Sequence, residues 1–467
     1  MALSRKSAGQ QRAKKITFPR NFQSGNSFVK PHPHFGSALQ NEFSDWRLWA
    51  DRGLVLAFAA AAGLTITGFT WLSERALAAF FQLERAAWWA PLIWTPLLAG
   101  AIVSVTRRFA PGAAGSGIPQ VIVVLSSDEA LARKSLFVSL RLSVVKILLT
   151  TAGLLGGLAL GREGPSVQVG AGVMGGARRW LSPQSRVSER GLMMAGGAAG
   201  IAAAFNTPLG GIMFAIEELS RSPEQRSSGL LLSAIVLSGL MAVSVFGNNT
   251  YFGVIRVEDL SLRMVLPGVV IAVASGVAGG LFSRLLISSL GDRLPDRIVR
   301  ARRKFPIRFA LGCGLAVAVL GVLSGGTSFG SGYEHTRAML NGEGEVAYLA
   351  AAFRFLATWL TAWSGVPGGL FAPSLAIGAD LGNSVSALMN YPNAPTLIAL
   401  GMVGFLAAVT QAPLTAFIIV MEMVDGHALV LSLIACSLIA SGVSRLVSVP
   451  LYASLAELQR TRIQPAS

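Results

Sequence analysis

Apolar residues occur in long runs along the chain, separated by short polar stretches. The longest runs cover roughly residues 52–73, 87–105, 135–160, 229–246, 265–290, 307–324 and 426–444. Several of them reach the length of about 20 residues that a helix needs to cross about 30 Å of hydrocarbon. The pattern therefore predicts an all-α polytopic membrane protein.

A second set of apolar segments is shorter and is interrupted by glycine and proline. These segments cover roughly residues 117–125, 165–177, 191–204, 208–216, 371–388, 396–409 and 412–421. Broken helices are tolerated at membrane depth where they line a cavity or pack inside the protein. We therefore expect some of these segments to surround a transport pathway.

Two of the broken segments begin with related motifs, 208 positions apart. Residues 161–166 read Gly-Arg-Glu-Gly-Pro-Ser, and residues 369–374 read Gly-Leu-Phe-Ala-Pro-Ser. A proline in the first turn is typical of a helix start, where unpaired backbone N–H groups favour a bound anion. Pro208 with Glu217 is likewise repeated by Pro413 with Glu422 at an offset of 205. These correspondences predict an internal repeat with the substrate site between its halves, and broken segments favour an inverted pair.

Composition and charge agree with a membrane protein. Hydrophobic residues make up 52% of the chain and charged residues 13%, and the mean hydropathy is +0.57. The net charge of +16 is explained better by loops facing the cytoplasm and anionic lipid than by nucleic acid. We expect a basic cytoplasmic tail over residues 1–47, a transport domain over 48–457 with halves at about 48–250 and 260–457, and a short cytoplasmic tail over 458–467.

Several glycine-rich loops carry the candidate chemistry. Ser116 lies between two glycines in the stretch Gly-Ser-Gly-Ile-Pro, where the backbone can approach a ligand. Glu163 lies at a helix start, where it is either a cap paired with Arg162 or a carboxylate that competes with an anion for the same donors. The matching loop has no acid, so Leu370 and Phe371 should provide backbone N–H groups to an anion permanently.

The motifs at residues 115–119, 161–165 and 369–373, in that order along the chain, resemble the selectivity-filter segments of the CLC family of chloride channels and chloride/proton antiporters. The resemblance runs from roughly Leu48 to Glu457. It implies the CLC-type fold of two inverted repeats with tilted helices, and a homodimer with one pore in each subunit. The filter residues that it implies are Gly115, Ser116, Gly117, Ile118, Pro119, Gly161, Arg162, Glu163, Gly164, Pro165, Gly369, Leu370, Phe371, Ala372 and Pro373.

The resemblance also implies particular roles. Glu163 would be the external gating and proton-transfer residue, and Glu218 the internal proton-transfer residue; the alternative for Glu218 is an interfacial carboxylate at a helix end. Tyr452 would donate its hydroxyl to chloride; the alternative is a tyrosine of the aromatic belt. The chloride-binding residues that it implies are Ser116, Arg162, Glu163, Gly164, Leu370, Phe371 and Tyr452.

We therefore expect a secondary active transporter that exchanges chloride for protons in the inner (plasma) membrane, with both termini in the cytoplasm. The alternative is a passive gated chloride channel of the same family. The sequence indicates no enzyme, because no nucleophile and base are recognisable, and no metal or other cofactor. Cys313 and Cys436 lie in apolar runs and should be core residues. The glycines at 170–175 spell a dinucleotide-binding pattern, but helix packing explains them better.

Overall fold

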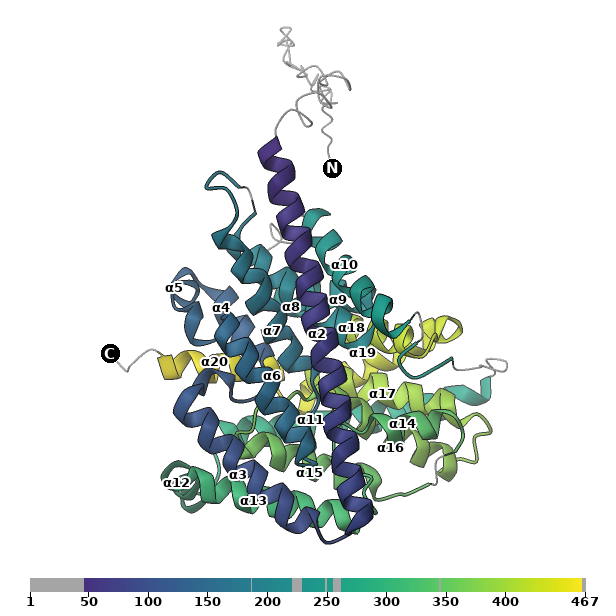
Figure 1. Ribbon diagram of the computed structural model, residues 1–467. Helices are drawn as coiled ribbons and strands as arrows, with labels where there is room; N and C mark the ends of the chain where they lie inside the picture. Colours follow the sequence, from purple (N-terminus) through teal and green to yellow (C-terminus); the bar gives the residue numbers. More distant parts are fainter. Residues whose placement is uncertain are drawn as a thin grey trace, which may run out of the picture. The chain divides into compact units, whose positions relative to one another are not determined.

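The computed structural model describes residues 46–185, 187–220, 229–247, 250–254, 262–343 and 346–463, so the predicted N-terminal tail lies almost wholly outside the described residues. The α-helices are α2 (Trp46–Ala86), α3 (Pro91–Phe109), α4 (Ile118–Ser126), α5 (Asp128–Ala132), α6 (Leu140–Leu155), α7 (Glu163–Gly176), α8 (Glu189–Phe205), α9 (Pro208–Phe214), α10 (Gly229–Phe246), α11 (Val265–Leu290), α12 (Asp296–Lys304), α13 (Pro306–Leu323), α14 (Tyr333–Leu340), α15 (Ala350–Ser364), α16 (Phe371–Leu388), α17 (Ala394–Thr410), α18 (Pro413–Met423), α19 (Val430–Val447) and α20 (Leu451–Ile463) (Figure 1).

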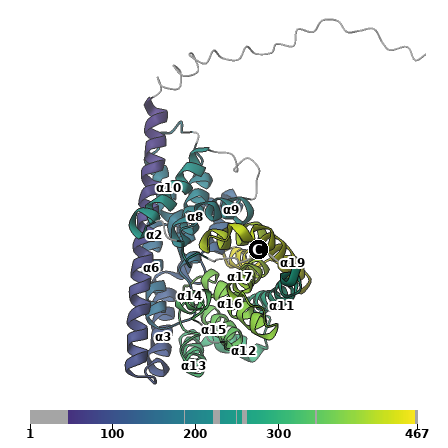
Figure 2. The same cartoon turned by 90° about the vertical axis from the view of Figure 1, so that its right-hand side faces the viewer.

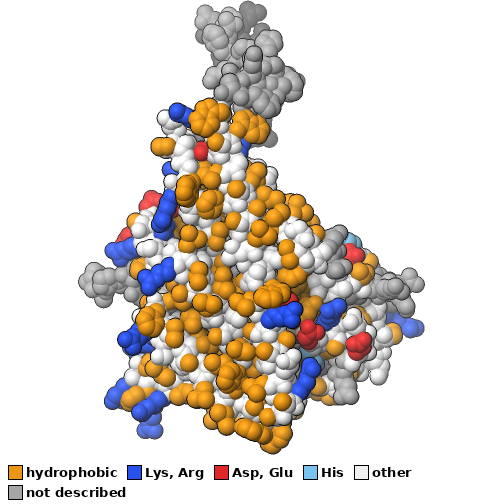
Figure 3. All heavy atoms as spheres, viewed as in Figure 1, with side chains coloured by type: hydrophobic (Ala, Val, Ile, Leu, Met, Phe, Trp, Pro, Cys, Tyr) orange, Lys and Arg blue, Asp and Glu red, His pale blue; other side chains and the backbone are white. Residues whose placement is uncertain are grey.

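The described residues confirm the predicted membrane architecture. Among them, six helical segments are long and apolar enough to cross a bilayer. Every predicted apolar run, long or broken, overlaps a helix, whereas α5, α12, α14, α15 and α20 were not predicted. Hydrophobic side chains spread over the face that carries α2, α3 and α6, with lysine and arginine mostly at its margins (Figure 3). Such a large exposed apolar surface suits contact with lipid.

The two halves of the chain build the same helix pair twice. In the first half α7 packs on α8. In the second half α16 packs on α17, and these two helices lie side by side in Figure 2. A Cβ atom at Gly170 would overlap the carbonyl of Gly196, and one at Gly378 would overlap the carbonyl of Gly401. Small residues therefore let the helix backbones touch. This confirms that the glycines at 170–175 serve helix packing. Cys313 and Cys436 are also buried, as predicted.

The two short Pro-Leu helices cap each other. The carboxylate of Glu217, just after α9, accepts the backbone N–H groups of Leu414 (3.2 Å) and Thr415 (2.6 Å) in α18. The carboxylate of Glu422, in α18, accepts those of Leu209 (3.2 Å) and Gly210 (2.8 Å) in α9. A carboxylate satisfies the unpaired N–H groups at a helix start. The exchange of equivalent groups is what two inverted copies around a two-fold axis produce.

Candidate functional site

Three loops that are far apart in the sequence meet at one point. Gly161 and Gly369 pair as an isolated antiparallel bridge, with N–O distances of 2.8 and 2.7 Å. The N–H group of Gly368 also donates to the carbonyl of Gly115, at 3.2 Å. Helices α7 and α16 start directly after the bridge, and α4 starts just after Gly115. The structure thus brings the three predicted filter segments together.

Glycine is required where these loops touch. A Cβ atom on Gly164 would overlap the Oγ atom of Ser116 and would lie 3.3 Å from the Cα atom of Gly369. Gly117 has φ of 109°, which side chains rarely adopt, and an added Cβ would lie 2.5 Å from the carbonyl oxygen of Gly164. The close approach of the backbones therefore depends on the glycines that the motifs contain.

The starts of α7 and α16 leave backbone N–H groups for a ligand. Their first residues, Glu163 and Phe371, are each 1% exposed. In the described part of the chain, neither N-cap residue, Arg162 or Leu370, provides a side-chain hydrogen bond. A buried helix start without a cap needs another partner for its N–H groups, and an anion is the natural one.

The carboxylate of Glu163 lies in this cradle. It is placed against the backbone N–H groups of Arg162, Glu163 and Ala372, so it draws on both helix starts. Its Oε2 atom lies against Gly161 and has no hydrogen-bond partner among the described residues. The carboxylate therefore occupies the donors that a bound anion would use.

The guanidinium of Arg162 pairs with groups outside the cradle. Its Nη2 atom lies 3.1 Å from a carboxylate oxygen of Glu74 in α2 and 3.3 Å from the hydroxyl of Tyr251. Arg162 thus pairs with Glu74, and the described residues contain no Arg162–Glu163 ion pair of the kind expected for a simple cap. Any part that Arg162 takes in anion binding must come from its backbone or its field.

Two buried hydroxyl groups lie on the other side of the junction. Ser116 is 6% exposed and Tyr452, in the second position of α20, is 1% exposed. The hydroxyls lie near each other, yet among the described residues neither has a well-formed hydrogen-bond partner. The ring of Tyr452 stacks on that of Phe371, with centroids 5.9 Å apart and an interplanar angle of 23°. Such burial does not fit an aromatic-belt tyrosine, and unpaired buried hydroxyls are suited to donate to a ligand.

Two cavities lead to the junction. The first, of about 370 Å³, is lined by Glu163, Arg162, Glu74 and Tyr251, and we call it the Glu163-side cavity. The second, of about 750 Å³, is lined by residues that include Ser116, Gly368, Leu370, Arg133 and Arg302, and we call it the Ser116-side cavity. The junction thus has one approach on the side of Glu163 and another on the side of Ser116.

Glu218 lies on a π-helical turn, Ala215–Leu219, that directly follows α9. It is half-buried and lies within electrostatic range of the hydroxyl of Tyr452. The corresponding position in the second half is Met423, at the end of α18, which is regular α-helix. An acid thus lies near the serine and tyrosine end of the site, in one half only.

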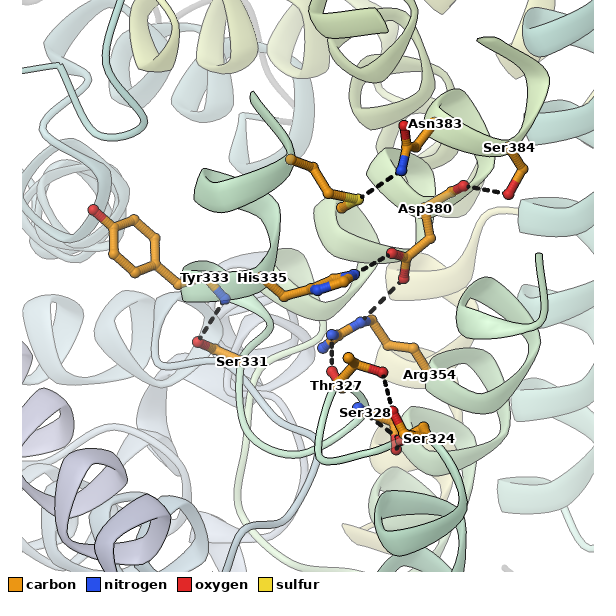
Figure 4. A network of polar contacts seen from close by, with 11 residues as sticks. Ser324, Thr327, Ser328, Ser331, Tyr333, His335, Arg354, Asp380, Asn383 and Ser384 are labelled. Carbon is orange, nitrogen blue, oxygen red and sulfur yellow. Dashed lines mark hydrogen bonds and ion pairs between the residues drawn. The ribbon is translucent and has the colours of Figure 1, made fainter. Parts of the chain in front are cut away.

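A buried polar network was not predicted from the sequence. Asp380 in α16 receives a hydrogen bond from Nε of Arg354 in α15 (3.3 Å) and lies 2.8 Å from Nε2 of His335 in α14 (Figure 4). Arg354 also donates to the carbonyl of Thr327. Arg354 and Asp380 are 1% and 2% exposed. The network therefore ties three helices and a glycine-rich turn together close to the Glu163-side cavity, which residues 331, 333 and 334 also line.

Sequence reasoning also missed several residues around the site. Glu74 directly follows the apolar run at 52–73 and is a carboxylate within the long helix α2, which is itself a signal of function in a membrane segment. Tyr251 follows a polar stretch and gave no signal. Gln120 and Gln168 gave none either, although both donate to the backbone of the serine loop.

Comparison with known families decides the classification. The family model described as voltage gated chloride channel matches residues 97–445, which is most of the chain. This chain belongs to the CLC family. The predicted family and the predicted all-α fold of inverted repeats are thereby confirmed.

Curated relatives cover nearly the same length. An H(+)/Cl(-) exchange transporter ClcA of Yersinia pseudotuberculosis is 30% identical over 431 residues, which are 86% of this chain and 87% of that protein. The exchange transporter ClcA of Salmonella typhi is 29% identical over 427 residues, which are 86% and 88% of the two chains.

Solved CLC structures have the same fold. A slow cyanobacterial Cl-/H+ antiporter superposes with a TM-score of 0.73 at 25% identity, covering 89% of this chain and 98% of the other. A CLC-type fluoride/proton antiporter also gives a TM-score of 0.73, at 22% identity, covering 88% and 98%. At that identity the second likeness concerns the fold alone.

Proposed function

We propose that this CLC protein exchanges chloride for protons across a membrane as a secondary active transporter. The observation that carries the proposal is the position of the Glu163 carboxylate, which lies among backbone N–H groups from both halves of the chain. A titratable group in an anion cradle links proton binding to anion binding. The similarity to proteins named as H(+)/Cl(-) exchange transporters supports the same function.

The proposed mechanism follows from competition for the cradle. An ionised Glu163 occupies the N–H groups of α7 and α16, and chloride takes its place when the carboxyl group binds a proton and leaves. Chloride is then held between these N–H groups and the hydroxyls of Ser116 and Tyr452. Glu218 supplies the proton from the opposite side, through the region of Tyr452. Obligatory alternation of Glu163 and chloride gives exchange instead of passive conduction.

The orientation follows from the basic residues near one cavity. Arg133 and Arg302 line the Ser116-side cavity, and Arg302 belongs to the mostly basic helix α12. Basic segments of membrane proteins remain in the cytoplasm. We propose that the Ser116 side faces the cytoplasm in the inner membrane, with both termini, and that Glu163 faces the outside.

We also propose a homodimer that forms through the face of α9 and α18. Leu209 and Leu414 are 51% and 42% exposed there, and the half-buried carboxylates of Glu217, just after α9, and Glu422, in α18, lie nearby. Carboxylates are unfavourable against lipid tails, so a second copy of the protein suits this face better than lipid. Lipid then surrounds the rest of the membrane surface.

The test is simultaneous recording of chloride and proton movement in proteoliposomes that contain the purified protein. With a chloride gradient and no proton gradient, exchange predicts protons moving uphill in the direction opposite to chloride. Chloride flux without proton movement would instead establish a passive channel, and absence of both fluxes would refute anion transport.

A further inference from the structure

The loop before Ser116 is held by side chains from three helices. Four consecutive carbonyl oxygens each accept a hydrogen bond from a buried side-chain donor. The pairs are Gly112 with Gln168 Nε2 (3.0 Å), Ala113 with Lys146 Nζ (2.7 Å), Ala114 with Gln120 Nε2 (2.6 Å) and Gly115 with Lys146 Nζ (2.5 Å). A turn whose carbonyls are all held in this way has little freedom to reorient.

Lys146 is the only donor of the three that carries a charge. It lies in the middle of α6 and is 0% exposed. Among the described residues its ammonium group forms no ion pair with a carboxylate, and its hydrogen-bond partners are two backbone carbonyls. A buried charge without a counter-ion is strongly unfavourable unless something nearby offsets it.

The carbonyl groups held by Lys146 belong to the anion site itself. Ser116 follows Gly115 directly, and its Oγ atom has no hydrogen-bond partner among the described residues. Gly115 also accepts the N–H group of Gly368, from the loop that leads into α16. Carbonyl oxygens would repel an anion, so holding them on Lys146 leaves the serine hydroxyl as the group presented to it.

We propose that Lys146 is a positioning and specificity-determining residue of the chloride site. Its ammonium group holds the carbonyls of Ala113 and Gly115 away from the anion, fixes the Ser116 hydroxyl toward it, and supplies the buried positive charge that the bound anion neutralises. The inference rests on the proposed function and names a further determinant of the same site.

Two substitutions separate the hydrogen bonds of Lys146 from its charge. Lys146→Met removes both, whereas Lys146→Gln keeps N–H donors without the charge. Lys304→Met is the matched control, because Lys304 is an exposed lysine at the end of α12 that stacks on the neighbouring Phe305. It changes the net charge equally and touches no part of the site.

The experiment is calorimetric titration of the purified full-length variants with chloride and with nitrate, after each is shown to be monodisperse in detergent. Lys146→Met should bind chloride at least about tenfold more weakly and should lose much of its preference for chloride over nitrate. Lys146→Gln should also bind chloride more weakly but keep more of that preference. Lys304→Met should behave like wild type.

A merely structural role gives a different result. In that case Lys146→Met lowers the thermal stability while chloride affinity and preference stay as in wild type, and the proposal is wrong. Wild-type affinity in Lys146→Gln would equally overturn it, and this variant decides the matter if Lys146→Met does not fold. Wild-type protein that binds no chloride would refute the proposed function. Wild-type protein that binds chloride, together with variants of Lys146 that bind it equally well, would refute only the role of Lys146.

Discussion

Glu163→Gln should separate chloride movement from proton movement. The amide has nearly the shape of the carboxylate but does not titrate at any relevant pH. In the structure the carboxylate meets three backbone N–H groups, those of Arg162, Glu163 and Ala372. The amide lacks the charge that strengthens these hydrogen bonds, and its NH₂ group cannot accept any of them.

The size of the effect follows from these three contacts. A hydrogen bond to a charged group contributes about 1 kcal/mol more than one between neutral groups, so residue 163 should hold the cradle about 3 kcal/mol less tightly. This corresponds to a factor of about a hundred in the competition with chloride. Because chloride no longer has to displace a carboxylate, its apparent affinity should rise by up to that factor, and the rise should be smaller if Glu163 vacates the cradle readily in wild type.

Two assays check the prediction. Calorimetry at neutral pH measures the chloride affinity, and proteoliposomes measure the two fluxes together. We expect tighter chloride binding, persistent chloride flux and no uphill proton movement. Glu334→Gln is the control, because Glu334 lines the Glu163-side cavity but is exposed. Uphill proton movement in Glu163→Gln, or an unchanged chloride affinity, would refute the competition for the cradle.

Other substitutions test the remaining groups. Glu218→Gln should abolish proton coupling in the flux assay while chloride flux continues, since the acid lies beside the anion path; loss of both fluxes in folded protein would favour a structural role. Ser116→Ala should lower the preference for chloride over nitrate, measured by competitive flux, because a hydroxyl donor is lost. Tyr452→Ala should weaken chloride binding more than Tyr452→Phe, and equal calorimetric affinities would exclude the assignment. Asp380→Asn should lower stability by about 3 to 5 kcal/mol by leaving Arg354 buried without its carboxylate, seen as a lower midpoint of thermal aggregation.

The sequence allowed the membrane class, the repeat and the three filter loops to be predicted, because each depends on local pattern. The apolar runs predict the helices. The glycine and proline residues of the repeated motifs predict where the broken helices begin. The crossed caps of Glu217 and Glu422 were visible only as a matching spacing. Their bonding partners lie about 200 positions away in the other half, so no local pattern could identify them.

The polar groups behind the site were not predictable in the same way. Arg354 lies in α15, which the apolar pattern did not identify, and its partner Asp380 lies inside an apolar helix where a lone acid has many possible partners. Gln120 and Gln168 are uncharged and gave no compositional signal. Their roles arise from the packing of α4 and α7 around one turn, which is a property of the tertiary structure alone.

The scaffold is symmetric between the halves, whereas its acids are not. Gly161 pairs with its own counterpart Gly369, and the crossed caps exchange equivalent groups. At two other equivalent positions the symmetry is broken, since Glu163 corresponds to Phe371 and Glu218 to Met423.

Two inverted helix starts suffice to converge N–H groups on one anion, and a second carboxylate at Phe371 would compete with that anion permanently. Inversion places equivalent positions on opposite sides of the site. An acid that is present in one half only therefore makes the two sides of the site chemically different. Glu163 then lies at one approach to the junction, and Glu218 near Tyr452 at the other. The proposed exchange therefore needs the symmetric fold to bind chloride, and the two departures from symmetry to give protons a path across it.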